Sequence, residues 1–439
     1  YALLRELLRI DTTNPPGNER PAAECVADFL AGVGLDVELL ESAPGRGNVV
    51  ARLTGDGTKP PLALVGHLDV VSAGDGTWTH PPFAAEEAEG WLWGRGAVDM
   101  KNMVAMSAAI VRRLAEEGAR LERDLILIAC ADEEAGCDQG SAWLVDHHAE
   151  KVACEYALGE VGGFSLPVMG RRFYPIQIAE KGIAWLKATA HGEAGHGSIP
   201  REDSAVLRLA EAIAAIGRTR LPQHRVEASE RYFRGVARHL PVPGRWIFPR
   251  VLDPVWSGLI LDRLIADPAL RRAIKAALSN TASPTVLSGG EKINVIPATA
   301  SVEIDGRTLP GQTASDLVAE LKAICGEHVD FEILKERPPV QSPPDTEVFR
   351  TLCEAIRRGD PEGIPVPYLL PGFTDAKAMH QVGAVWYGFA PVRLPDEAGV
   401  KFSDLYHRPN ERIPIEGFHW GLDVLDDAVR RIAGVAAGG

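Results

Sequence analysis

The chain has 439 residues, and its hydrophobic fraction of 46% and charged fraction of 24% are typical of a globular protein in water. The formal net charge of -14 argues against a nucleic-acid partner, and because no apolar run is long enough to span a bilayer, no membrane partner is expected either. The six cysteines form no C-x-x-C pair and no secretion signal is visible near the first residue, so we expect a cytoplasmic protein with reduced thiols.

Strands and helices alternate along the first part of the chain. Apolar spacing predicts helices at 1–10, 22–31 and 103–116, and short apolar runs predict strands at 35–40, 48–53, 62–65 and 125–129. Helix 347–358 and strand 384–389 resume the same style late in the chain. Alternation of this kind predicts the α/β class, with a mostly parallel sheet that is flanked by helices on both faces.

A second pattern begins near residue 183. It consists, in chain order, of strand 183–190, helix 204–216, strands 285–287 and 300–304, helix 314–325 and strand 329–334. This is a βαββαβ unit, the pattern of a small two-layer α+β domain. Residues 223–280, rich in Arg, Pro and Trp and ending in a helix, are interpreted as an insertion into it. Since the chain is too long for one core, we expect one domain of residues 1–181 and 338–439 and another of residues 182–337.

Two polar side chains follow the predicted strand at 62–65. His67 and Asp69 stand two residues apart in G-H-L-D, and on an extended chain they point the same way, so that the carboxylate can support the imidazole. A third candidate, Asp99, lies in the glycine-rich turn W-G-R-G-A-V-D-M-K before the helix at 103–116. Because ligands of open α/β sheets bind at the carboxyl ends of strands, these residues mark a candidate site.

Four further candidates lie at other strand ends and in a late loop. Glu133 and Glu134 come directly after a predicted strand, and two adjacent carboxylates are cheaply desolvated only when cations neutralise them. A solvated acidic loop is the alternative for this pair. Glu160 follows a short apolar run, and His407 lies in L-Y-H-R-P-N-E-R-I, where a lone histidine would otherwise be a surface residue.

Donors of His, Asp, Glu, Glu and His type suit two divalent ions that share one bridging carboxylate. Imidazole and carboxylate ligands without thiolate favour Zn²⁺, with Co²⁺ or Mn²⁺ as alternatives. Two such ions, roughly 4 Å apart, can hold one hydroxide between them and polarise a carbonyl. A spare carboxylate would then act as general base, taking the proton of the water and returning it to the leaving amine.

The motifs resemble the co-catalytic zinc peptidase superfamily of aminoacylases, carboxypeptidase S, glutamate carboxypeptidase and succinyl-diaminopimelate desuccinylase. The likeness runs from about residue 7 to residue 413 and rests on G-H-L-D-V-V, W-T-H-P-P-F, G-R-G-A-V-D-M-K, D-E-E and H-R-P-N-E-R-I, which occur in the family's order. The W-T-H-P-P-F segment and the long insertion look most like the aminoacylase and carboxypeptidase S branch. The resemblance implies a zinc-peptidase catalytic domain with an inserted lid or dimerisation domain.

The resemblance also assigns roles to the candidates of the first domain. It implies one zinc held by His67, Asp99 and Glu160, and another held by Asp99, Glu134 and His407, so that Asp99 bridges the two. By the same likeness Glu133 is the general base, and Asp69 orients His67 from behind.

Further roles follow for the smaller domain and for one late loop. G-E-A-G-H-G-S-I-P resembles the lid motif in which a histidine, here His196, stabilises the oxyanion, often in the site of a neighbouring subunit. K-I-N-V-I-P and E-I-D-G-R-T-L-P resemble stretches that present Asn294 and Arg307 to the substrate, and a guanidinium suits a free α-carboxylate. Thr374 lies in G-F-T-D-A-K, which is similar to a substrate-side G-G-T-D-A-R loop but has Phe373 where the family usually has glycine.

These observations predict a metal-dependent amidohydrolase that acts on N-acyl amino acids or short peptides with a free carboxylate. A dipeptidase, a carboxypeptidase or a biosynthetic deacylase of the same superfamily is the alternative. A catalytically silent binding protein should have lost Glu133 or a ligand, whereas this chain retains them all. A serine hydrolase is excluded because no G-x-S-x-G motif occurs. The expected partners are a small-molecule substrate and a second copy of the chain, which would form a homodimer through the lid domain.

Overall fold

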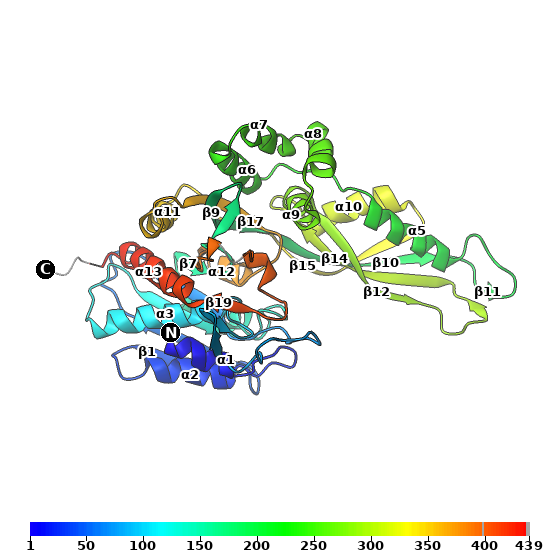
Figure 1. Ribbon diagram of the computed structural model, residues 1–439. Coiled ribbons are helices and arrows are strands. Elements are labelled where there is room, and N and C mark those ends of the chain that lie inside the picture. Colours follow the sequence, from blue (N-terminus) through cyan, green and yellow to red (C-terminus); the bar gives the residue numbers. More distant parts are fainter. Residues whose placement is uncertain (397–398, 436–439) are drawn as a thin grey trace. The chain divides into compact units, whose positions relative to one another are not determined.

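The computed structural model describes residues 1–396 and 399–435. The chain forms two compact units (Figure 1). Unit 1 contains Tyr1–Ile178, Ser342–Tyr368 and Thr374–Gly439, and unit 2 contains Ala179–Gln341 together with Leu369–Phe373. No helix in the described ranges is both long and apolar enough to cross a bilayer.

The larger sheet has the strand order β1-β2-β6-β3-β7-β18-β9-β16, and β8 and β17 also pair with β9. The strands are β1 (Asp36–Glu41), β2 (Gly47–Leu53), β3 (Leu62–His67), β6 (Leu125–Cys130), β7 (Tyr156–Gly159), β8 (Leu166–Val168), β9 (Arg171–Glu180), β16 (Val340–Gln341), β17 (Ile364–Leu370) and β18 (Val385–Gly388). Four neighbours, β6, β3, β7 and β18, run parallel, whereas β1, β2 and β9 pair antiparallel.

The predicted α/β class is confirmed, and the sheet is mixed. Strands β3 and β6 are buried along their whole length, as parallel strands covered on both faces must be. The edge strand β1 is partly exposed and joins β2 through a short loop, a connection that only antiparallel neighbours can use. The parallel strands therefore form the centre of the sheet, and it is their ends that carry the candidate residues.

Helices of unit 1 cover the sheet. They are α1 (Ala2–Arg9), α2 (Arg20–Leu30), α3 (Lys101–Glu116), α4 (Ser141–Val152), α11 (Glu347–Gly359), α12 (Ala376–Gln381) and α13 (Ile415–Ile432). Helix α3 is almost entirely buried and packs against α1, α2 and α13. The middle of α3, from Met103 to Val111, is apolar apart from Ser107, as is typical of a helix enclosed by other elements.

A small sheet joins two distant loops of unit 1. It has the order β19-β5-β4 and consists of β4 (Glu86–Ala88), β5 (Trp91–Trp93) and β19 (Arg412–Pro414). The antiparallel pairing of Arg412 with Trp93 places the loop before β19 next to the loop after β5. The first of these loops contains His407 and the second contains Asp99.

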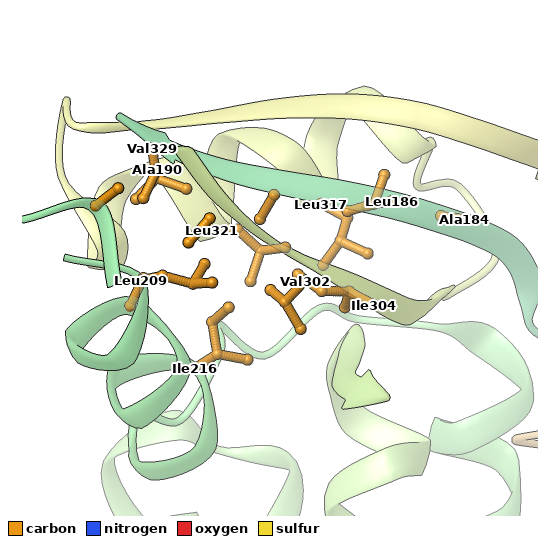
Figure 2. Packing of buried hydrophobic residues seen from close by; sticks show 14 of the residues in the cluster. Ala184, Leu186, Ala190, Leu209, Ile216, Val302, Ile304, Leu317, Leu321 and Val329 are labelled. Atoms are coloured by element: carbon orange, nitrogen blue, oxygen red, sulfur yellow. The ribbon is translucent and has the colours of Figure 1, made fainter. Parts of the chain in front are cut away.

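Unit 2 contains an antiparallel sheet of order β12-β14-β10-β15. Its strands are β10 (Gly182–His191), β12 (Thr281–Gly289), β14 (Thr299–Thr308) and β15 (Val329–Arg337), and its helices are α5 (Ala205–Arg218) and α10 (Ala314–Cys325). Figure 2 shows Leu186, Val302 and Ile304 of the sheet packed against Leu209 of α5 and Leu321 of α10. This is the predicted βαββαβ pattern, with the two helices on one face of the sheet.

The insertion between α5 and β12 has a small core of its own. It consists of α6 (Glu227–His239), α7 (Gly244–Ile247), η1 (Phe248–Leu252), α8 (Pro254–Leu259), η2 (Ile260–Leu264) and α9 (Pro268–Leu278). Phe233, Val251, Leu261, Ile274 and Leu278 form the core that holds these short elements together. The segment is therefore an ordered helical cluster.

Candidate metal centre

His67 is fully buried at the end of β3. Its Nδ1 lies 2.9 Å from the carbonyl oxygen of Asp69 and 3.4 Å from the Asp69 carboxylate. A carbonyl oxygen can only accept a hydrogen bond, so Nδ1 carries the proton and the lone pair of Nε2 is left for a ligand role. The support that was expected from the Asp69 carboxylate thus comes mainly from the main-chain oxygen of the same residue.

The carboxylate of Asp69 instead holds the turn after β6. It accepts hydrogen bonds from the backbone N–H of Glu133 (3.0 Å), from the backbone N–H of Glu134 (3.1 Å) and from the side-chain amide of Asn14 (2.8 Å). Asp69 is fully buried, which would raise its pKa, but the neighbouring His67 and the hydrogen bonds from Asn14 and the backbone of Glu133 lower it below the usual value. One residue therefore fixes the histidine through its main-chain oxygen and both glutamates through its carboxylate.

Asp99 lies between two imidazoles. Its Oδ1 is 3.3 Å from Nε2 of His67, and its Oδ2 is 3.1 Å from Nε2 of His407. Each carboxylate oxygen thus faces a different histidine, which is the arrangement that a bridging ligand requires.

The three glutamates divide between the two histidines. Nε2 of His67 lies 3.7 Å from Glu160 and 3.9 Å from Glu133, whereas Nε2 of His407 lies 3.2 Å from Glu134. Two groups of potential ligand atoms result, each with its atoms within 4.8 Å of one another: His67, Asp99 and Glu134 in one, and His67, Glu133 and Glu160 in the other. The structure brings together all six candidates for metal ligand or base in unit 1, namely His67, Asp99, Glu133, Glu134, Glu160 and His407.

The buried carboxylates of this cluster need positive charge. Burial raises the pKa of Glu133 well above its usual range, and the neighbouring charge of Glu160 adds to the effect. Burial likewise raises the pKa of Glu160 to about 8, and its buried Oε1 has no hydrogen-bond partner within the described chain. A buried carboxylate oxygen without a hydrogen-bond partner, beside other carboxylates, is stabilised when it binds a divalent cation. These donors are therefore suited to hold a metal ion.

His407 shows the same need for positive charge. Hydrogen bonds to Asp99 and Glu134 raise its pKa to about 10, so without a cation the imidazole holds a proton between the two carboxylates. Its backbone has φ of 57°, a left-handed conformation that is uncommon for a residue other than glycine. Strain of this kind concentrates at functional sites.

Sequence reasoning missed a buried ion pair beneath Asp99. Oε1 of Glu411 accepts the backbone N–H groups of Val98 (2.9 Å) and Asp99 (3.2 Å), and Oε2 accepts Nη1 of Arg95 (2.5 Å). Glu411 is fully buried, and burial raises its pKa to about 7. Arg95 lies in the motif G-R-G and Glu411 in the motif H-R-P-N-E. Their position in these two motifs was the only feature of the sequence that could have indicated a role at the site.

A second missed residue is Asp375, next to the predicted substrate residue Thr374. The carboxylate of Asp375 accepts the hydroxyl of Ser141 (2.5 Å) and the thiol of Cys130 (3.2 Å). Thr374 is itself fully buried, and its hydroxyl oxygen accepts the backbone N–H of Ala376 (3.1 Å). This loop is thus held from within unit 1.

The three remaining predicted residues lie in unit 2. The ribbon of β11 (Gly195–His196) and β13 (Val295–Ile296) pairs His196 with the residue after Asn294, so these two predicted residues are neighbours. His196 is exposed, and its Nδ1 lies 2.7 Å from the hydroxyl of Ser198.

Arg307 is held within unit 2 by two neighbours. Its Nε and Nη2 donate to the carboxylate of Asp305 at 2.7 and 3.1 Å, and its guanidinium lies 5.3 Å from the ring centre of Phe373. In the described chain only Nη1 of this guanidinium is buried without a partner. The departure at position 373 thus lies against the predicted carboxylate anchor.

Comparison with known proteins agrees with this geometry. Human aminoacylase-1 is 28% identical over 452 residues, which cover 99% of this chain and 95% of that protein. A probable carboxypeptidase S-like protein of Dictyostelium discoideum is 26% identical over 84% of this chain and 71% of its own length. In the same fold, an M20 metallo-carboxypeptidase from Sulfolobus solfataricus superposes with a TM-score of 0.69 at 17% identity over 98% of both chains. Residues 63–431 match the model of Peptidase family M20/M25/M40, which confirms the predicted resemblance: the chain belongs to this family.

Proposed function

We propose that the chain is a two-metal amidohydrolase that releases an amino acid from an N-acyl amino acid. Family membership makes it a metal-dependent hydrolase of amide bonds. The observation that carries the finer proposal is the position of Asp99 between His67 and His407, each facing one oxygen of its carboxylate. This arrangement supports one bridging ligand and a terminal histidine on either side.

In this proposal His67, Asp99 and Glu160 hold one ion, and Asp99, Glu134 and His407 hold the other. The combination of imidazole and carboxylate donors in these two sets suits zinc. When bound, two such ions polarise the scissile carbonyl and lower the pKa of a water molecule. Asp69 keeps the Nδ1 proton of His67 in place and holds the Glu133–Glu134 turn through two backbone N–H groups.

Glu133 is the proposed general base. It is 5% exposed, and its burial beside Glu160 raises its pKa well above the usual range of a carboxyl group. A carboxyl group with a raised pKa accepts a proton and returns it near neutral pH more readily than an ordinary one does. Glu133 lies nearly as close to His67 as Glu160 does, so the order of the residues in D-E-E, and not distance, supports this division of roles.

Unit 2 is proposed to act as a lid and as the surface of a homodimer. His196 would stabilise the oxyanion from its exposed ribbon, while Asn294, Arg307 and Thr374 would contact the substrate. Nη1 of Arg307 is buried without a partner among the described residues, which supports a role in binding the free carboxylate of the substrate. We also propose a cytoplasmic location, which the six free cysteines support.

A chelation and substrate experiment tests the proposed function. Purified protein should contain up to two zinc ions per chain, and a chelator should abolish hydrolysis of N-acyl amino acids until metal is restored. Full activity after exhaustive chelation would refute the metal proposal. A short-peptide hydrolase is the second candidate, favoured by the carboxypeptidase relative, and a parallel screen of dipeptides separates the two.

A thermodynamic cycle tests Arg307. Amidation of the substrate carboxylate should remove most of kcat/KM in the native enzyme but little in Arg307→Ala, because both changes delete the same contact. Independent and additive effects would show that Arg307 binds another group.

A further inference from the structure

The helical insertion exposes large apolar side chains. On α7 and the turn before it, Val242 is 74% exposed and Trp246 is 70% exposed, and on α8 the exposed fractions of Val255, Trp256 and Leu259 are 82%, 44% and 53%. We call these five residues the tryptophan surface. Single exposed apolar residues are ordinary, but a group that includes two tryptophans in one small segment indicates contact with another body.

The five residues of the tryptophan surface lie outside the core of the insertion. Both α7 and α8 pack on η1, and all three elements follow one another directly in the chain (α7 and α8, green in Figure 1). Residues of η1 and of η2, which follows α8, contribute to the core through Val251 and Leu261. Val255 and Leu259 stand one helical turn apart on α8 and share one face, away from the buried Ser257 and Ile260.

The charge of the insertion is opposite to that of the chain. Residues 223–280 contain ten Lys and Arg but five Asp and Glu, a net charge of +5 in a chain whose net charge is -14. The acidic residues are already engaged: Glu227 pairs with Arg231, and Asp262 pairs with Arg220. Asp253 caps the first turn of α8.

Several arginines of the insertion consequently have no acidic partner among the described residues. In the ranges that the structure describes, Arg238, Arg245 and Arg263 are exposed and form no ion pair. The guanidinium of Arg250 lies 5.7 Å from the ring centre of Trp256. Exposed Trp, Val and Leu interspersed with free arginines form the pattern of a segment that lies in the interface of a bilayer, where apolar groups enter the acyl region and guanidinium groups bind phosphate.

We propose that the tryptophan surface, with its surrounding arginines, binds the surface of an anionic phospholipid bilayer. Turns and short helices present these side chains, and a fluid bilayer accepts such projections without a complementary shape. The proposal revises the expectation that a membrane is not a partner, which rested on the absence of a spanning segment and on the acidic net charge. A peripheral contact needs neither a spanning helix nor a basic protein, only a local basic and apolar surface.

Vesicle binding by the full chain tests the proposal. The chain should sediment with vesicles of phosphatidylcholine and phosphatidylglycerol, and should bind vesicles of phosphatidylcholine alone much more weakly. Binding should weaken with salt, because the Debye length falls to about 8 Å at physiological ionic strength. Acyl chains brominated near the headgroup should quench tryptophan emission.

Matched variants locate the contact. The pair Trp246→Ser and Trp256→Ser should raise the lipid concentration at half-binding by about tenfold or more and abolish the quenching. The pair Val286→Ser and Leu287→Ser, also exposed apolar positions of unit 2, should change neither. Arg245→Glu should weaken binding, whereas Arg218→Glu on α5 makes the same charge change and should leave binding nearly unchanged.

Three results would overturn the proposal. The first is equal binding of the chain to neutral and anionic vesicles. The second is equal binding by the double tryptophan variant and by the Val286→Ser, Leu287→Ser control. The third is failure of the chain to sediment with anionic vesicles at low salt. Light scattering tests the alternative, that a second copy of the chain covers this surface. That alternative would be shown by a dimer that dissociates when Trp246→Ser and Trp256→Ser are combined, in a chain that binds no vesicles. Circular dichroism melting of each variant confirms that it is folded.

Discussion

The metal centre and the helical insertion treat charge in opposite ways. In the centre, the carboxylates of Asp69 and Glu411 are fully buried, and each accepts several hydrogen bonds from fixed donors. In the insertion, Arg245 and Arg263 are exposed and, in the described chain, unpaired. The difference teaches that the first region works through geometry fixed inside the fold, whereas the second works through groups left available to an outside partner.

Loss of the proposed base, Glu133, should lower the catalytic rate more than any other substitution considered. Glu133→Gln keeps the shape of the side chain but cannot accept a proton, so kcat should fall by about 10²–10⁴-fold while metal content hardly changes. Glu134→Gln is the matched control at the neighbouring position and should lower metal content. Single-turnover kinetics and metal analysis of both proteins measure this, and equal metal loss in the two would contradict the division of roles.

The lid histidine should have the next largest effect. His196→Ala should retain both metals and the fold but lose about 10²–10³-fold in turnover, the usual scale for one oxyanion donor. If the histidine acts across a dimer, mixing His196→Ala with Glu133→Gln subunits should restore about one quarter of wild-type activity, since about half the dimers are mixed and each has one working site. No recovery after proven subunit exchange would place the histidine in its own chain's site or remove it from the mechanism.

The ion pair beneath Asp99 should set metal affinity. Glu411→Gln removes the charge that faces Arg95 and weakens the hold on the Asp99 backbone, so affinity for zinc should fall about 10–100-fold, as for other residues that orient ligands. Calorimetric titration of the metal-free protein measures this, with the exposed Glu416→Gln on α13 as control. The visible spectrum of the Co²⁺ form should change only in Glu411→Gln, and unchanged affinity would mean that the pair serves stability alone.

Metal affinity should also depend on pH. The pKa of Glu160 is raised to about 8 by burial in the metal-free protein, so below pH 8 this carboxyl holds a proton that a metal must displace. The apparent association constant should therefore fall by about tenfold per pH unit per displaced proton as the pH is lowered through this range. Titration in buffers of different ionisation enthalpy counts the released protons, and a pH-independent constant would contradict the raised pKa.

The insertion should give the smallest effect on catalysis. Trp246→Ser on the exposed face of α7 should change turnover of a soluble substrate by no more than about twofold and stability by about 0.5 kcal/mol at most, because surface substitutions rarely do more. A large loss of activity with unchanged metal content would show that the insertion takes part in catalysis. The metal centre and the insertion could then not be treated as regions with separate roles.

Much of the centre could be predicted because its residues end neighbouring strands. His67 ends β3 and Glu133 follows β6, and these strands pair in parallel, so both side chains reach the same edge of the sheet. His407 follows no predicted strand, and its role as a ligand rests on the resemblance of its motif.

The buried charges and the sheet edges could not be predicted in the same way. Glu411 and Arg95 carry no sequence signal of burial, since a sequence does not show which loop charges the fold will cover. The antiparallel edges of the larger sheet depend on chain direction, which short apolar runs do not encode. The outward face of the insertion likewise depends on which of its apolar residues its own core takes up.

The pairing of Arg412 with Trp93 has a consequence for synthesis on the ribosome. His67, Asp99 and Glu160 all leave the ribosome long before His407, so a nascent chain contains the ligands proposed for one ion while the other set still lacks its histidine. At about 5–20 residues per second, the interval between Glu160 and His407 lasts tens of seconds or less. Under the proposed ligand assignment, the order of translation would complete the set of His67, Asp99 and Glu160 before the set that needs His407.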